Sequence, residues 1–164
     1  MTDSAEGGSR HVHAGVRWTW AFEGLLALQA PDATLMWLPV GTFTGRDAVR
    51  GALEMLFTAF PDFERTKDSM ISQGNTVALE FTATGTFTGG PFDGYQPTGA
   101  SGEVIGSELI TVDDDGMIMS TRTYWDGMQM ARELGLMPDE DSILDRGLHG
   151  ALNVMTRARR VIRL

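Results

Sequence analysis

The chain contains no cysteine among its 164 residues. This absence excludes disulfide bonds, zinc–thiolate sites, iron–sulfur clusters and thiol catalysis. Long hydrophobic runs are missing too, and no segment approaches the roughly 20 apolar residues that a membrane-spanning helix needs. The N-terminus is acidic and polar, without the basic start and apolar stretch of a secretory signal. We therefore expect a cytoplasmic protein that is not associated with a membrane.

Motifs that bind phosphate, calcium or catalytic metals are also missing. The sequence has no glycine-rich phosphate loop and no nucleophile elbow around a serine. The acidic turn at residues 113–116 lacks the spacing and the closing glutamate of a calcium-binding loop. His11 and His13 lie two residues apart near the terminus, with no third ligand nearby. We expect neither a bound metal nor a cofactor.

Positive charge is scarce and unevenly placed. The chain has 13 Lys and Arg against 22 Asp and Glu, a net charge of −9. Residues 1–145 carry 8 basic and all 22 acidic side chains, hence −14, whereas residues 146–164 carry five arginines and no acid. The acidic body should repel a phosphate backbone, so we expect no nucleic-acid partner. The basic tail could bind nucleic acid or anionic lipid, or it neutralises the acidic body of its own chain or of a partner subunit.

Length and hydrophobic periodicity predict one α+β domain with a segment on either side. Helices are predicted over 10–29, 45–60 and 127–135, and strands over 33–38, 63–72, 77–84, 103–112 and 117–126. This order favours helices packed on one face of an antiparallel sheet. We expect a disordered tail over 1–9, the domain over 10–137, and a C-terminal helical extension over 138–164.

The extension carries an apolar stripe on a helix predicted over about 142–160. The apolar residues follow each other in steps of 4, 3, 4, 3 and 4, which is heptad spacing. They are Leu144, Leu148, Ala151, Met155, Ala158 and Ile162. The pattern covers under three heptads, so we expect the helix to pack against its own domain or a second subunit rather than form a free coiled coil.

Several short phrases occur in a characteristic order over residues 20–137. They are Ala30-Pro31-Asp32-Ala33, Gly45-Arg46-Asp47-Ala48-Val49-Arg50, Phe60-Pro61-Asp62-Phe63, Gly85-Thr86-Phe87-Thr88-Gly89, Pro97-Thr98-Gly99, Gly116-Met117-Ile118, Tyr124-Trp125-Asp126 and Glu133-Leu134-Gly135-Leu136. With these phrases the chain resembles the SnoaL-like polyketide cyclase branch of the NTF2-like superfamily. The resemblance implies a cone-shaped barrel, in which a bent antiparallel sheet wraps around helices and a deep cavity. It also implies a homodimer, because members often pair through the outer face of the sheet.

The family's relatives include cyclases, ketosteroid isomerases, epoxide hydrolases, dehydratases and non-catalytic binding domains, so fold alone does not settle function. In SnoaL-like cyclases, an aspartate placed like Asp126 looks like the catalytic acid/base for a metal-free aldol ring closure. A carboxyl group does this best where apolar surroundings raise its pKa toward neutrality. The alternative is that Asp126 caps the helix that begins near Gly127.

Glu108 is a second candidate, and it follows from the residues themselves. Its strand face is otherwise apolar, with Val104, Gly106, Ile110 and Val112. A carboxylate among such residues is unfavourable unless it is paired or faces a cavity. Glu108 is therefore either a second catalytic acid/base or a glutamate held in a salt bridge or at the rim.

Three further residues are candidates for substrate binding. Arg122 and Tyr124 share a strand face with Asp126, where they could bind a substrate carbonyl; the alternative is a solvated face. Trp37 lies in a region that often lines the cavity in this superfamily, and otherwise it belongs to the core. The family's cyclases carry a histidine near Glu108, which this chain lacks.

These observations lead to two functional hypotheses. The first is a cofactor-independent acid/base enzyme of the cyclase, isomerase or lyase type, acting on an apolar, polycyclic carbonyl compound. The second is a small-molecule-binding or scaffold domain that has kept the cavity and lost the chemistry, which the missing histidine supports.

Overall fold

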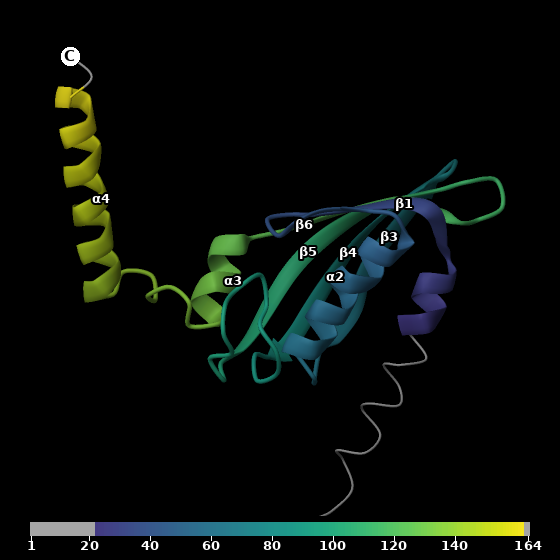
Figure 1. The fold of residues 1–164 in the computed structure, drawn as a ribbon, viewed down its shortest axis with the longest axis horizontal. Helices are drawn as coiled ribbons and strands as arrows, with labels where there is room; N and C mark the ends of the chain where they lie inside the picture. Colours follow the sequence, from purple (N-terminus) through teal and green to yellow (C-terminus); the bar gives the residue numbers. More distant parts are fainter. Residues whose placement is uncertain (1–21, 163–164) are drawn as a thin grey trace, which may run out of the picture.

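The structure, a computed structural model, describes residues 22–162. Six of its strands form one curved sheet in the order β2-β1-β6-β5-β4-β3 (Figure 1). The strands are β1 (Gln29–Trp37), β2 (Gly41–Thr44), β3 (Glu64–Gln73), β4 (Thr76–Thr86), β5 (Ser101–Val112) and β6 (Ile118–Trp125). The helices are α2 (Arg46–Ala59), α3 (Gly127–Glu133) and α4 (Ile143–Ile162), and residues 22–27 are also helical. The predicted α+β class is confirmed.

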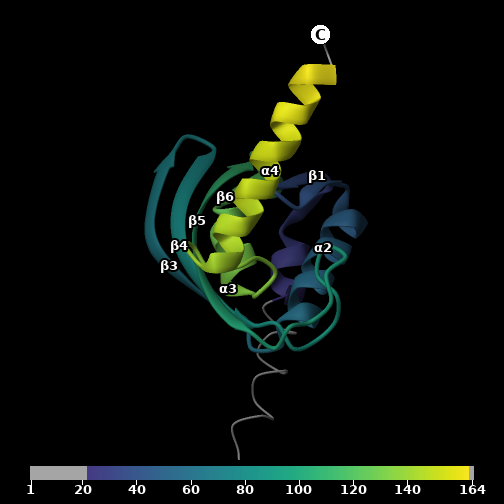
Figure 2. The same ribbon diagram turned by 90° about the vertical axis from the view of Figure 1, so that its left-hand side faces the viewer.

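The sheet is antiparallel apart from one pair of strands. β3, β4, β5 and β6 form a meander in chain order, and β1 pairs with β2 as a hairpin. β1 runs parallel to β6 and joins the hairpin to the meander. Figure 2 shows how strongly the sheet curves, with β3 and β4 on one side and β1 and α2 on the other. The curvature gives the sheet an inner face that α2 partly covers.

Helix α2 supplies one side of the core. Val49, Ala52, Leu56 and Ala59 recur at helical spacing and are buried. The helix ends before Pro61, as predicted. Beyond it, the segment 87–100 returns across the end of α2, where Phe87 stacks on Phe60 with ring centroids 5.2 Å apart. These rings close that end of the molecule with apolar contacts.

Strand β1 begins earlier than the sequence predicts. The segment from Ala30 to Asp32 directly follows the helix predicted over 10–29, and it should end that helix because the residue before a proline avoids helical angles. Instead it lies inside β1, and Ala30 and Ala33 are buried. The β1–β6 register shifts between Gln29 and Thr34, and such an irregularity accommodates a proline that cannot donate to the sheet. Most of the predicted helix over 10–29 lies outside the described residues, as does the predicted tail over 1–9.

Two helices follow the sheet. Asp126 directly follows β6 and is the N-cap of α3. Near the start of α4, the carboxylate of Asp145 lies 3.4 Å from Nη2 of Arg132 on α3 and is 2% exposed. The rest of α4 extends beyond the body (Figure 1). None of the helices in the described part of the chain is long and apolar enough to cross a membrane.

Candidate active-site cavity

The inner face of the sheet encloses a cavity of about 210 Å³ together with α2 and residues 22–25. Successive residues of a strand point to opposite faces, so one alternate set from each strand faces inward. Apolar and aromatic side chains make up most of the wall. They are Phe22, Leu25, Leu35, Trp37, Leu53, Leu56, Phe57, Phe63, Phe81 and Trp125. The other lining residues are Arg65, Glu108 and Thr123. A few polar groups in an apolar wall are typical of a small-molecule site.

Glu108 is the carboxylate of this cavity, and it is 9% exposed. It lies directly opposite Thr123 in the β5–β6 register, and Oγ1 of Thr123 donates a hydrogen bond of 3.0 Å to its Oε1. Nη2 of Arg65 donates to the other oxygen, Oε2, over 2.6 Å. Because an ionised carboxylate can accept about four hydrogen bonds, two neighbours leave it capacity for a ligand.

Arg65 reaches Glu108 from the edge strand β3. Its guanidinium lies 3.8 Å from the centroid of the Phe81 ring, a cation–π contact, and its side chain is 34% exposed. The ring of Phe81 lies over Gly106 of β5, where an added Cβ would be 2.4 Å from Cζ of Phe81. The missing side chain at residue 106 therefore makes room for the ring, and the ring supports the arginine beside Glu108.

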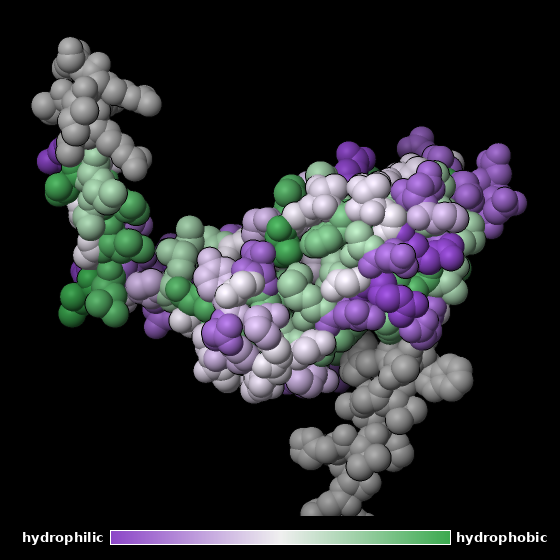
Figure 3. Space-filling model, in the orientation of Figure 1, coloured by the Kyte–Doolittle hydropathy of each residue, from purple (hydrophilic) through white to green (hydrophobic). Residues whose placement is uncertain are grey.

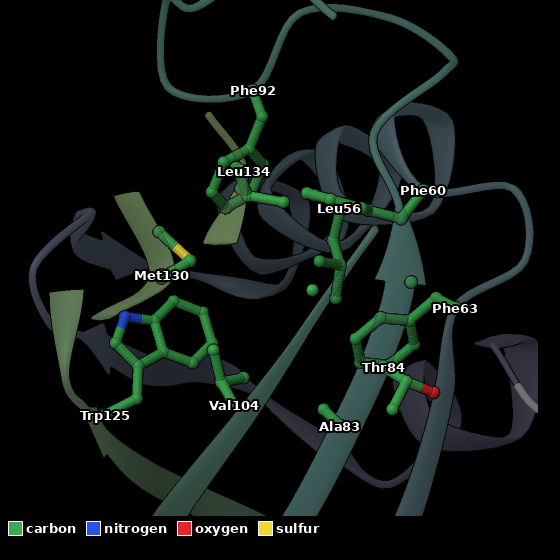
Figure 4. Close-up of a pocket in the computed structure, with 12 residues that line it drawn as sticks. Leu56, Phe60, Phe63, Ala83, Thr84, Phe92, Val104, Trp125, Met130 and Leu134 are labelled. Carbon is green, nitrogen blue, oxygen red and sulfur yellow. The ribbon is translucent and has the colours of Figure 1, made fainter. Parts of the chain in front are cut away.

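A smaller cavity of about 40 Å³ adjoins the first (Figure 4). The two share Leu56, Phe63 and Trp125, and the smaller one continues past Val104 and Met130. Within the described residues, the buried Nε1 of Trp125 has no hydrogen-bond partner, and Figure 4 shows it on the Met130 side of the ring. The shared side chains separate one apolar space from the other.

The structure brings two of the five predicted site residues into the larger cavity. Glu108 lies in its wall, and so does Trp37, which is 4% exposed and packs edge-on against Trp125 with ring centroids 5.2 Å apart. Arg122 and Tyr124 alternate with the lining residues Thr123 and Trp125, so they lie on the opposite face of β6.

Asp126 has a different environment. Its carboxylate is exposed, and its Oδ1 accepts hydrogen bonds from the backbone N–H groups of Met128 at 2.9 Å and Gln129 at 3.1 Å. It is not among the residues that line either cavity. Its contacts are those of an N-cap of α3.

Sequence reasoning missed Arg65 and Thr123. Thr123 has a signal in the two-residue period, because it shares a strand face with Trp125, whereas Arg65 has none, because every residue of its strand is exposed. The arginine considered from the sequence was Arg122, which the structure places on the outer face of β6. The contact between Arg65 and Glu108 joins residues 43 positions apart, so no local pattern carries it.

A polar groove lies outside the cavity, between the ends of β3, β4 and β5. In it, the Asp62 carboxylate accepts hydrogen bonds from the backbone N–H and Oγ1 of Thr86 at 2.7 and 2.6 Å. Burial raises the pKa of Asp62, but the hydrogen bonds from Thr86 outweigh it and hold the pKa below its ordinary value of 3.8. Across residues 22–162, no three His, Asp or Glu side chains are grouped closely enough to hold a metal ion.

Comparison with solved structures identifies the fold. A proposed SnoaL-like polyketide cyclase from a Jannaschia species shares 20% sequence identity at a TM-score of 0.65, covering 80% of this chain and 100% of its own. A protein from Catenulispora acidiphila with a ketosteroid isomerase-like fold shares 20% identity at a TM-score of 0.61, covering 80% of this chain and 98% of its own. The fold is therefore NTF2-like, as the resemblance implied.

One similar structure has a higher identity. IdmH, a proposed polyketide cyclase from Streptomyces antibioticus, shares 26% identity at a TM-score of 0.58, covering 77% of this chain and 99% of its own. No curated protein sequence matches the chain. The model of the SnoaL-like polyketide cyclase family matches residues 12–134, which is most of the chain. The chain therefore belongs to the SnoaL-like polyketide cyclase family.

Proposed function

We propose that the chain is a cofactor-independent acid/base enzyme that acts on an apolar, polycyclic carbonyl compound, in a cyclase or isomerase reaction. The observation that carries this proposal is a carboxylate, Glu108, in the wall of an otherwise mostly apolar cavity. Aromatic side chains such as Trp37 and Phe81 suit a flat, multi-ring ligand. A carboxylate that faces such a ligand is a general base for a carbon acid.

The reaction divides between two side chains. Glu108 takes a proton from a carbon next to a carbonyl; the C–H bond breaks, an O–H bond forms on Glu108, and the electron pair moves onto the carbonyl oxygen. The guanidinium of Arg65, with its remaining N–H donors, stabilises the resulting enolate. For ring closure, the enolate carbon attacks a second carbonyl and the new alkoxide takes the proton back from Glu108. For isomerisation, the proton returns to another carbon.

The same geometry also favours a second candidate, a non-catalytic binding domain. Both oxygens of Glu108 already accept hydrogen bonds, from Arg65 and Thr123. A carboxylate in an ion pair is a weaker base, and such a pair can simply recognise a polar group on a ligand. This candidate predicts ligand binding without turnover.

Hydrogen–deuterium exchange separates the two candidates. β-Tetralone, a bicyclic ketone with acidic protons next to its carbonyl, is incubated with the protein in D₂O, and its mass is followed. We expect exchange faster than in buffer, and a loss of roughly 10²–10⁴-fold in that rate for Glu108→Gln. Glu103→Gln is the matched control, because Glu103 lies on the same strand but its side chain points to the opposite face of the sheet from Glu108. This variant should catalyse exchange at the wild-type rate.

One result would contradict the role of Glu108, and another would contradict the enzyme proposal as a whole. Full exchange by Glu108→Gln moves the base to another residue, and Asp126→Asn is then the variant to measure. Quenching of tryptophan fluorescence by β-tetralone with no exchange above buffer supports the binding domain, because Trp37 and Trp125 both line the cavity.

A further inference from the structure

The two neighbouring cavities lie in a row along the strands of the sheet. On β5, Glu108 lines the larger cavity, and Val104, four residues earlier on the same face, lines the smaller one. Four residues of a strand span about 13 Å. The polar groups are therefore at one end of the row, and the smaller, apolar cavity is at the other. None of the described residues of α4 lines either cavity, and Figure 3 shows the hydrophobic side chains of that helix away from the body.

Three side chains stand between the two cavities and line both of them. We call these residues, Leu56, Phe63 and Trp125, the divider. Trp125 packs against Trp37 with ring centroids 5.2 Å apart, and Phe63 packs edge-on against Phe57 at 5.7 Å. Leu56 reaches the divider from α2 and is 8% exposed, and Figure 4 shows its side chain between those of Trp125 and Phe63. Leu56 is therefore the part of the divider that a single truncation opens without removing an aromatic contact.

The volume of the larger cavity decides how many fused rings it can hold. A two-ring ketone such as β-tetralone has a van der Waals volume of about 140 Å³, and at the packing density of a protein interior, about 0.75, it needs a space of about 190 Å³. A third fused ring raises this requirement to about 240 Å³ at the same density. The larger cavity has about 210 Å³, which is enough for two rings and too little for three. The two cavities together amount to about 250 Å³, which is enough for three.

The polar pair at one end of the row sets the direction of a bound ketone. Its acidic carbon faces Glu108 and its carbonyl oxygen faces the guanidinium of Arg65. Along β5 the space beside Glu108 continues toward Val104, because Ile110, two residues the other way, lines neither cavity. The rings therefore extend toward the divider. We propose that Leu56 determines the specificity of the site, so that two fused rings fit and a third is excluded; this inference rests on the proposed function for the placement of the carbonyl.

Equilibrium dialysis of the full chain tests this size limit. The two ligands are β-tetralone and the dihydroanthracenone that carries one further fused benzene ring in line. The wild-type chain should bind the three-ring ketone at least about tenfold more weakly than β-tetralone, because a ligand that is too large forces the packed walls apart. In Leu56→Ala the third ring can enter the smaller cavity, so the three-ring ketone should bind at least as tightly as β-tetralone.

Two further variants separate an opened divider from a loosened core. Leu26→Ala is the matched control, because Leu26 is 2% exposed, undergoes the same truncation and lines neither cavity. This variant should keep the wild-type preference for β-tetralone. Leu56→Val removes a single methylene group and is measured in case Leu56→Ala does not fold, which circular dichroism shows. It should raise the affinity for the three-ring ketone relative to β-tetralone, by less than Leu56→Ala.

The outcomes distinguish this inference from the proposed function. Equal binding of the two ketones by the wild-type chain, or an unchanged preference in the folded Leu56 variants, would overturn the role of Leu56 and leave the proposed reaction standing. Deuterium exchange of the three-ring ketone is followed in the same samples. If Leu56→Ala gains binding and exchange, both proposals are supported; if it gains binding without exchange, the role of Leu56 is supported and the enzyme proposal is contradicted. No binding of β-tetralone by the wild-type chain would refute both.

Discussion

Removal of the Arg65 side chain should destabilise the folded protein by about 3 kcal/mol. Removing one partner of a buried ion pair typically costs about 3–5 kcal/mol, because it leaves an uncompensated charge. Here the Glu108 side chain is 10% exposed and Arg65 is 34% exposed. Water can therefore partly fill the space that Arg65→Met opens, which places the expected value at the lower end. Glu108 would keep the hydrogen bond from Thr123 but lose its countercharge.

Two further variants complete a double-mutant cycle. Glu108→Gln leaves a guanidinium that is already one-third exposed and rests on Phe81, so this change should cost about 1 kcal/mol. In the double variant, no buried carboxylate remains to be compensated. We expect the double variant to be more stable than Arg65→Met alone, with a coupling energy of about 1.5–3 kcal/mol.

Urea unfolding at neutral pH, followed by tryptophan fluorescence, measures each corner of the cycle. In a thermal melt, 3 kcal/mol corresponds to a fall in melting temperature of roughly 6–12 °C, at about 2–4 °C per kcal/mol for a chain of this size. Costs that simply add, to within about 0.5 kcal/mol, would refute the reasoning. They would mean that the two side chains do not interact in the folded protein, despite the 2.6 Å between Nη2 and Oε2.

Three further predictions concern single positions. Gly106→Ala should destabilise by about 1–3 kcal/mol in urea unfolding, because its Cβ would press on Phe81, whereas Gly51→Ala, with open space around it, should be neutral or stabilising. Asp126→Ala should lower the free energy of unfolding by about 1 kcal/mol, because the N-cap of α3 is lost, while Asp126→Asn should keep both the stability and the exchange activity. Loss of exchange activity in Asp126→Asn would instead identify Asp126 as the base. The pKa of Asp62 is lower in the folded than in the unfolded chain, so its stabilising contribution is full above about pH 3.8 and is lost as the pH falls through the lower folded value. Thermal melts of the wild-type chain across that pH range should show this loss of stability. The Asp62→Asn variant should lack this part of the pH dependence.

The placement of Glu108 could be predicted from the sequence because strand alternation is local. An acidic residue that lies an even number of positions from Val104, Gly106 and Ile110 on one strand has to face the same side of the sheet as they do. The structure confirms the strand, which runs from Ser101 to Val112, and places Glu108 in the cavity wall. The partner of the carboxylate could not be predicted in this way, because pairing between strands is long-range.

Strand β6 shows the limit of the same rule. The two-residue period groups Arg122 with Tyr124 and Thr123 with Trp125, but both sets contain a polar and an aromatic residue. Composition therefore does not say which set faces inward. The answer depends on which side of the sheet α2 covers, and that is a property of the whole fold.

The residue that strand β3 contributes to the cavity is even harder to predict from the sequence. All ten of its residues are exposed or largely so, and Arg65 is among them. An edge strand with so little burial gives no hydrophobic alternation from which an inward face could be deduced. Arg65 enters the cavity only because the sheet curves and brings β3 over Phe81.

The outer face of β3 determines which residue reaches the cavity. The β3–β4 register steps by one residue between Lys67 and Ser69, so Asp68 is the extra residue of a β-bulge. On the solvent side, Oγ1 of Thr82 donates to the Asp68 carboxylate at 2.8 Å. A shift of the strand by one residue would turn Arg65 outward and leave Glu108 without its countercharge. The hydrogen bond to Asp68 opposes such a shift, so exposed polar contacts on the far side of an edge strand help to set the electrostatics inside the cavity.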